Sequence, residues 1–134
     1  MTATTARPLV FMALASAALF AGAATSALTG ANGDPEKGKA VFEKCAACHS
    51  VDDAKGDGPA LKGMFGRKAG SLEDYRYSAA MIRSGIVWDR TTLDAYVANP
   101  QGYIKGNRMA FAGIADKTER EDLIAYLERA TKPD

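Results

Sequence analysis

The only two cysteines and the only histidine of this chain lie within one short stretch, Cys45-Ala46-Ala47-Cys48-His49. A thiol can add across a vinyl group to form a thioether, and an imidazole nitrogen can ligate iron. The spacing C-x-x-C-H is typical of a c-type haem attachment site. The sequence therefore predicts a haem c bound covalently through Cys45 and Cys48, with His49 as one axial ligand of the iron.

Other uses of a close cysteine pair fit this chain less well. A disulfide between Cys45 and Cys48 would close a very short loop and would constrain little of the unfolded chain. A thioredoxin-like pair needs a βαβ context, whereas the residues around this pair show no strand-like alternation. A zinc site takes about four ligands, more than two cysteines and one histidine supply.

A helix over residues 34–45 is expected to lead into the motif. Asp34 can cap its first turn, and Val41 and Phe42 provide an apolar side. Gly38 lowers helix stability by roughly 1 kcal/mol relative to alanine. The close approach of another helix would explain why a glycine stands there.

The rest of the chain predicts short helices and long loops. Residues 50–70 and 102–113 are predicted to be loops, and Asn99-Pro100 should end a helix because proline cannot continue it. Loops this long are uncommon in a small domain unless they have something to pack on, and a large apolar macrocycle would serve.

The expected fold is all-α, with four to five short helices around one haem. Further helices are expected over residues 78–83, from Asp89 or Thr91 to Asn99, and from a capping box at Thr118-Glu119-Arg120-Glu121, with Leu123, Tyr126, Leu127 and Ala130 as the apolar stripe.

The N-terminal residues have the pattern of a secretory signal. Arg7 precedes an uncharged apolar run over residues 9–24, and small residues then dominate. Cleavage after Ala27 or Ala31 would suit this preference for small residues. We therefore expect residues 1–31 to be a signal peptide that directs the protein to the periplasm.

An uncleaved membrane anchor is the alternative for the same segment. Residues 9–28 contain no charge and are long enough to cross a bilayer. Alanine and glycine make this stretch only moderately hydrophobic, and no basic stop-transfer cluster follows it. Under either interpretation, residues 32–134 form the haem domain.

Composition indicates one globular domain with little net charge. The chain has 134 residues, of which 47% are hydrophobic and 25% charged. Arg7 is the only charged residue before Asp34, so removal of the signal would leave 16 basic residues against 16 acidic ones. This balance argues against nucleic acid as a partner.

From Gly33 to Pro133 the chain resembles the class I cytochromes c, which include the mitochondrial protein and its bacterial relatives. The C-x-x-C-H motif alone occurs in many folds, whereas the full ordered series of matches is specific. The resemblance implies the class I fold and electron transfer through a haem c. After the motif the matches are Gly58-Pro59-Ala60-Leu61, Phe65-Gly66-Arg67, Tyr75, Tyr77, Gly85-Ile86-Val87-Trp88, Tyr96, Asn99-Pro100, Tyr103-Ile104, Met109, Phe111-Ala112-Gly113-Ile114 and Lys117 through Tyr126-Leu127.

The sixth iron ligand is left open by the motif. Without a second histidine, the candidates are methionine, lysine, tyrosine or water. Met64 lies shortly after the motif and Met81 in a short helical stretch, whereas Met109 lies in a loop that could reach the face opposite His49. The resemblance also places the family's axial methionine at Met109.

The resemblance further implies residues that support the haem. Pro59 matches a residue whose carbonyl accepts the proton on the second nitrogen of the haem histidine, which orients the ring. Tyr96 matches a residue that reaches toward the axial sulfur. Three more match groups around the buried haem propionates: Arg67, Tyr77 and Trp88.

Departures from the family pattern also carry expectations. In many relatives an asparagine joins a polar network under the haem. Met81 replaces it here, so we expect that network to be drier or to have its hydrogen bonds satisfied by other groups. Lys105 replaces a common proline, so the loop that carries Met109 should be less rigid. Gln101 and Gly102 stand where relatives often carry lysine. The basic ring that docks partners in the family is therefore thinned, with these members retained: Lys44, Lys55, Arg108 and Lys117.

The expected function is a one-electron carrier and not an enzyme. His/Met ligation fills both axial positions and raises the reduction potential. The resemblance implies a cytochrome bc-type complex or a dehydrogenase as donor and a terminal oxidase or photosynthetic reaction centre as acceptor. We expect a monomer that docks transiently and takes no small-molecule substrate. A peroxidase-like haem enzyme with an open sixth position, and an electron-transfer cytochrome anchored in the membrane, are the alternatives.

Overall fold

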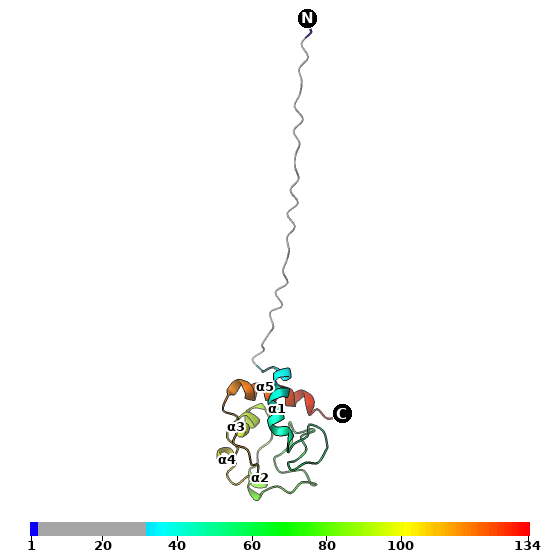
Figure 1. The fold of residues 1–134 in the computed structure, drawn as a ribbon. Coiled ribbons are helices and arrows are strands. Elements are labelled where there is room, and N and C mark those ends of the chain that lie inside the picture. Colours follow the sequence, from blue (N-terminus) through cyan, green and yellow to red (C-terminus); the bar gives the residue numbers. More distant parts are fainter. Residues whose placement is uncertain (3–31) are drawn as a thin grey trace.

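The computed structural model describes residues 1–2 and 32–134 (Figure 1). The predicted cleavage sites and the apolar run lie outside the described residues. The elements are α1 (Pro35–Ala46), α2 (Ala79–Arg83), α3 (Arg90–Ala98), α4 (Pro100–Tyr103) and α5 (Lys117–Ala130). Within the described part the only β-type pairing is an isolated bridge between Lys68 and Val87. The all-α prediction with four to five short helices is confirmed.

Helices α1 and α5 pack directly against each other at one end of the domain, while α2 and α4 lie at the other end (Figure 1). Gly38 makes the close approach possible, because a Cβ atom there would lie 1.9 Å from the backbone oxygen of Asp122 in α5. The side chain of Asp122 also accepts a 2.6 Å hydrogen bond from the amide of Asp34. The helix contact predicted from Gly38 is therefore confirmed.

The start of α5 differs from the sequence prediction. A capping box was expected to begin at Thr118, but Asp116 is the N-cap and the helix begins at Lys117. The Asp116 carboxylate accepts a 3.0 Å hydrogen bond from the amide of Glu119, three residues further on. Asp116 therefore satisfies a free amide of the first turn, and Thr118 lies inside the helix.

The short helix α4 was not predicted, since residues 102–113 were expected to be loop throughout. Pro100 does end α3, but it also occupies the first position of α4. The Asn99 side chain caps this turn by accepting a 2.9 Å hydrogen bond from the amide of Gly102. A single residue, Asn99, thus separates two helices.

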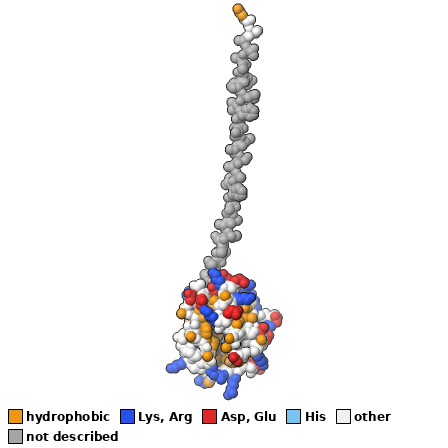
Figure 2. All heavy atoms as spheres, viewed as in Figure 1, with side chains coloured by type: hydrophobic (Ala, Val, Ile, Leu, Met, Phe, Trp, Pro, Cys, Tyr) orange, Lys and Arg blue, Asp and Glu red, His pale blue; other side chains and the backbone are white. Residues whose placement is uncertain are grey.

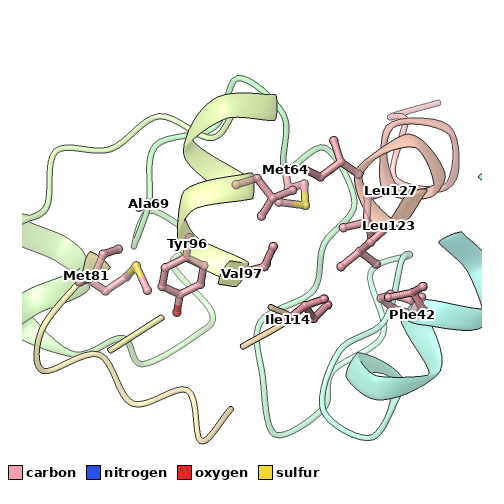
Figure 3. Close-up of a cluster of buried hydrophobic side chains, with 13 residues drawn as sticks. Phe42, Met64, Ala69, Met81, Tyr96, Val97, Ile114, Leu123 and Leu127 are labelled. Atoms are coloured by element: carbon pink, nitrogen blue, oxygen red, sulfur yellow. The ribbon is translucent and has the colours of Figure 1, made fainter. Parts of the chain in front are cut away.

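The hydrophobic core extends from α1 and α5 to α2 and α3. Figure 3 shows Phe42, Leu123 and Leu127 on one side of this cluster and Met81 and Tyr96 on the other. Several of these core side chains also line the cavity described next, so the core and the candidate site share their walls. In the described part of the chain, no helix is long and apolar enough to cross a membrane.

Candidate functional site

Helices α1, α2, α3 and α5 and the two long loops line a cavity of about 430 Å³. This volume falls within the range of cofactor sites in proteins. Most of the wall is apolar, with Met64 and Leu123 among its buried residues. Every site residue predicted from the sequence lines this cavity: Cys45, Cys48, His49, Pro59, Arg67, Tyr77, Trp88, Tyr96 and Met109.

The C-terminal end of α1 places the two cysteines and the histidine on one side of the cavity. The amides of Cys48 and His49 both donate to the carbonyl of Cys45, each at 3.0 Å, which turns the chain tightly after the helix. Burial raises the pKa of the Cys45 thiol, and the lysine next to it opposes this shift only in part. Cys48 is exposed. Both cysteines line the cavity wall within this one turn of the chain.

The imidazole of His49 is oriented by backbone groups of the following loop. Its Nδ1 atom lies 2.8 Å from the carbonyl oxygen of Pro59, which can only accept a hydrogen bond. Nδ1 must therefore carry a proton, so in the neutral imidazole Nε2 is the nitrogen with the lone pair that a metal requires. Gly58 lies against the ring, because a Cβ atom there would be 2.5 Å from Cε1 of His49. The loop thus fixes both the tautomer and the ring position.

Met109 contributes a thioether to the same cavity from a distant part of the chain. The Tyr96 hydroxyl lies 3.8 Å from its sulfur and donates a weak hydrogen bond to it. Tyr96 is only 6% exposed, and burial raises its pKa to about 12. The phenol is therefore neutral near pH 7 and acts as a donor toward the sulfur.

The donor set and the cavity fit a haem c. Two thiols can form its thioether links, an imidazole with a free Nε2 can ligate iron, and apolar walls suit a macrocycle. The comparisons with known proteins agree. The family model for cytochrome c matches residues 35–131. The chain belongs to the cytochrome c family.

Curated members of this family are similar over most of their length. Cytochrome c of Gibberella zeae is 48% identical over 105 residues, which cover 76% of this chain and 99% of that protein. Cytochrome c of Sesamum indicum is 45% identical over 102 residues, with 74% and 92% covered. Cytochrome c type-1 of Ascaris suum is 47% identical over 102 residues, with 75% and 91% covered. The predicted family, class I fold and covalent haem c at Cys45 and Cys48 are confirmed.

Arg67 lies where the cytochrome c resemblance expects a group near the haem propionates. Its guanidinium donates to the carbonyl of Lys62 at 2.8 Å and to that of Ala60 at 3.0 Å. These two bonds hold the guanidinium at the cavity wall and leave three of its five N–H groups for other partners. The arrangement allows Arg67 to offer both charge and donors to a carboxylate, and its role toward the propionates stays a prediction.

Aromatic side chains complete this part of the wall. The Trp88 ring packs on Tyr96 with a centroid separation of 5.1 Å, and Tyr77 packs on Tyr75 at 4.7 Å. Burial raises the pKa of Tyr77, with the Arg67 charge acting in the opposite direction. Tyr77 is thus a neutral O–H donor near pH 7. Tyr96 belongs to the hydrophobic core, Trp88 and Tyr77 pack against that core, and all four rings line the cavity.

Sequence reasoning did not find Asn107, which lies two residues before Met109. Its side chain is only 6% exposed and hydrogen-bonds to three backbone groups of α4 and the following loop, including the amide of Met109. A polar residue between flexible loop residues gave no signal that it would be buried. The structure shows instead that this loop closes around it.

Met81 is buried and lines the cavity close to the part of the core formed by Tyr96 (Figure 3). We expect Met81→Asn to lower the free energy of unfolding by about 1–3 kcal/mol, because it places an amide in an apolar pocket. Met81→Leu, the matched control, should lose less than about 1.5 kcal/mol. Urea unfolding of the holoprotein measures both. If the two variants were equally stable, the introduced asparagine amide would have found a hydrogen-bond partner in the pocket, contrary to this prediction.

Proposed function

We propose that His49 and Met109 occupy the two axial positions of the haem iron and that this closed site makes the chain a one-electron carrier rather than a haem enzyme. Bound haem c supplies the one-electron couple of its iron. Cys45 and Cys48 would bind the haem covalently. The loop after the motif would orient His49, and the later loop would hold Met109 close to the iron. The observation that carries the proposal is that both axial candidates line one cavity.

The spectrum of the oxidised holoprotein tests this proposal. A low-spin spectrum with a sulfur–iron charge-transfer band in the red is expected, together with a reversible one-electron titration. A high-spin ferric spectrum with peroxide turnover would instead support the peroxidase-like alternative. It would mean that Met109 leaves the sixth position open.

The proposed partners are membrane redox complexes that a monomeric carrier visits transiently. A cytochrome bc-type complex or a dehydrogenase would be the donor, and a terminal oxidase or a photosynthetic reaction centre the acceptor. Membership of the cytochrome c family supports a redox partner on each side. Direct electron-transfer measurements with purified complexes test these candidates.

Charge on the domain surface supports weak rather than strong electrostatic steering. The face drawn in Figure 2 carries both signs of charge. Three of the four basic residues expected to form the docking ring are paired with acidic residues: Lys44 with Glu119 at 2.6 Å, Lys55 with Asp74 at 3.4 Å and Lys117 with Glu121 at 2.8 Å. Acidic partners would therefore meet a partly neutralised surface.

We expect the association rate with a cytochrome bc-type complex to fall less than about fivefold between 0.01 and 0.15 M salt, below the tenfold or more typical of strong steering. Stopped-flow haem reduction measures this rate. Glu119→Gln frees Lys44 and should make the dependence steeper. A steep fall for the wild-type protein would contradict the expectation.

Export to the periplasm with cleavage of residues 1–31 is the proposed origin of the mature protein. The proposal rests on Arg7, the apolar run after it and the small residues around Ala27 and Ala31. N-terminal sequencing of the native protein tests it. A mature chain that begins near residue 32 is expected, whereas an intact Arg7 in the membrane fraction would favour the anchor.

A further inference from the structure

The loop that carries Met109 is fastened by the buried side chain of Asn107. Its Nδ2 atom donates to the carbonyls of Pro100 and Ile104, at 2.8 and 2.9 Å. Its Oδ1 atom accepts a 2.8 Å hydrogen bond from the amide of Met109. One side chain thus ties the backbone of the proposed ligand to both ends of α4.

Gln101 adds contacts to the same loop from α4. Its Nε2 atom lies 3.3 Å from the carbonyl of Asn107, 3.2 Å from Oδ1 of Asn107 and 3.3 Å from the carbonyl of Met109. The amide of Met109 is therefore held by Asn107 and its carbonyl by Gln101. These groups fix the backbone on both sides of the Met109 side chain.

These hydrogen bonds compensate for the lysine that stands at position 105 where many relatives have a proline. A lysine there leaves the backbone before Gly106 without the fixed φ angle that a proline would impose. Lys105 and Gly106 are both exposed, and Gly106 has a φ of +87°, which glycine adopts freely. Side-chain hydrogen bonds must therefore supply the order that the local sequence does not.

We propose that Asn107 and Gln101 form a positioning clamp that holds the Met109 sulfur at the haem iron. The inference rests on the proposed ligation by Met109 and assigns two residues that control it. The clamp acts through the Met109 backbone, and none of its hydrogen bonds involves the Met109 sulfur. Weakening it should raise the fraction of molecules in which the loop is open, with the fold intact.

Exogenous imidazole measures this open fraction. Imidazole competes with Met109 for the ferric iron, and its apparent affinity rises in proportion to the open population. Asn107→Ala removes three hydrogen bonds to backbone groups, each of which shifts an equilibrium by roughly two- to tenfold, so this variant should bind imidazole at least about tenfold more tightly than the wild type. Gln101→Glu puts a carboxylate against three acceptor oxygens and should tighten binding about tenfold.

Matched variants separate positioning from general stability. Asn107→Asp keeps the acceptor for the Met109 amide and loses the two donors, so its imidazole affinity should lie between those of the wild type and Asn107→Ala. Asp34→Ala removes the N-cap of α1, at the far end of the domain from α4 (Figure 1). It should lower the unfolding midpoint by far-UV circular dichroism without changing imidazole affinity. Gln101 is exposed, so its variants are expected to fold even if those of Asn107 do not.

Hydrogen exchange of the Met109 amide gives an independent readout. Its protection should fall at least tenfold in Asn107→Ala and remain in Asp34→Ala. Imidazole affinities in both clamp variants that match the Asp34→Ala control would overturn the clamp while leaving ligation intact. A wild-type ferric protein without the charge-transfer band would overturn the ligation and the clamp together.

Discussion

Replacing Met109 with leucine is expected to abolish the sulfur–iron charge-transfer band and to lower the reduction potential by on the order of 0.1–0.3 V, out of the roughly 0.8 V that axial ligands span. Leucine fills a similar volume and has no atom that can ligate iron, so the cavity should persist. The proposed carrier would then have an accessible sixth position. Spectra and a redox titration of the holoprotein measure both effects.

The other cavity methionines serve as controls for this prediction. Met64 and Met81 line the same cavity and are more deeply buried than Met109. Met64→Leu and Met81→Leu should keep the band and change the potential much less. If Met81→Leu or Met64→Leu removed the band instead, the axial ligand would have been assigned to the wrong methionine.

Gly38→Ala should destabilise the protein, although alanine is the better helix former. Alanine in a helix gains about 1 kcal/mol over glycine. Against this, its Cβ would lie 1.9 Å from the carbonyl oxygen of Asp122, so α1 and α5 must move apart. Overpacking reaches about 3 kcal/mol when backbone must shift. The expected net loss is therefore about 2 kcal/mol in denaturant unfolding of the holoprotein.

The neighbouring position gives a control at an exposed residue of the same helix. Lys39 is exposed in α1, and Lys39→Ala should change the free energy of unfolding by no more than about 0.5 kcal/mol. A Gly38→Ala variant as stable as the wild type would contradict this prediction, because it would show that α1 and α5 can move apart at little cost in free energy. The haem spectrum of both variants should be unchanged at neutral pH.

The attachment site could be predicted because its chemistry is contiguous in sequence. Cys45, Cys48 and His49 follow one another at the end of a helix, and a tight turn brings them together with no need for distant contacts. The remaining cavity residues were predicted from the family resemblance, and the structure places them around the same space. Their individual roles toward haem stay predictions.

The start of a helix was predicted correctly at α1, left between two positions at α3 and placed two residues too late at α5. Asp34 and Asp89 cap α1 and α3, and the second of these was one of two starts considered. At α5 both Asp116 and Thr118 could cap, and the carboxylate two residues earlier prevailed. The turn α4 was missed because its cap, Asn99, was interpreted only as the end of a helix.

Taken by itself, the sequence determined the covalent haem site, the all-α class and the contact implied by Gly38, because each depends on residue types at short spacing. Only the tertiary structure decided how the Met109 loop is held. Sequence reasoning expected a looser loop from Lys105, whereas Asn107 is buried and bonded to both ends of α4. Burial of a polar side chain depends on which backbone groups surround it after folding, and spacing along the chain does not contain that information.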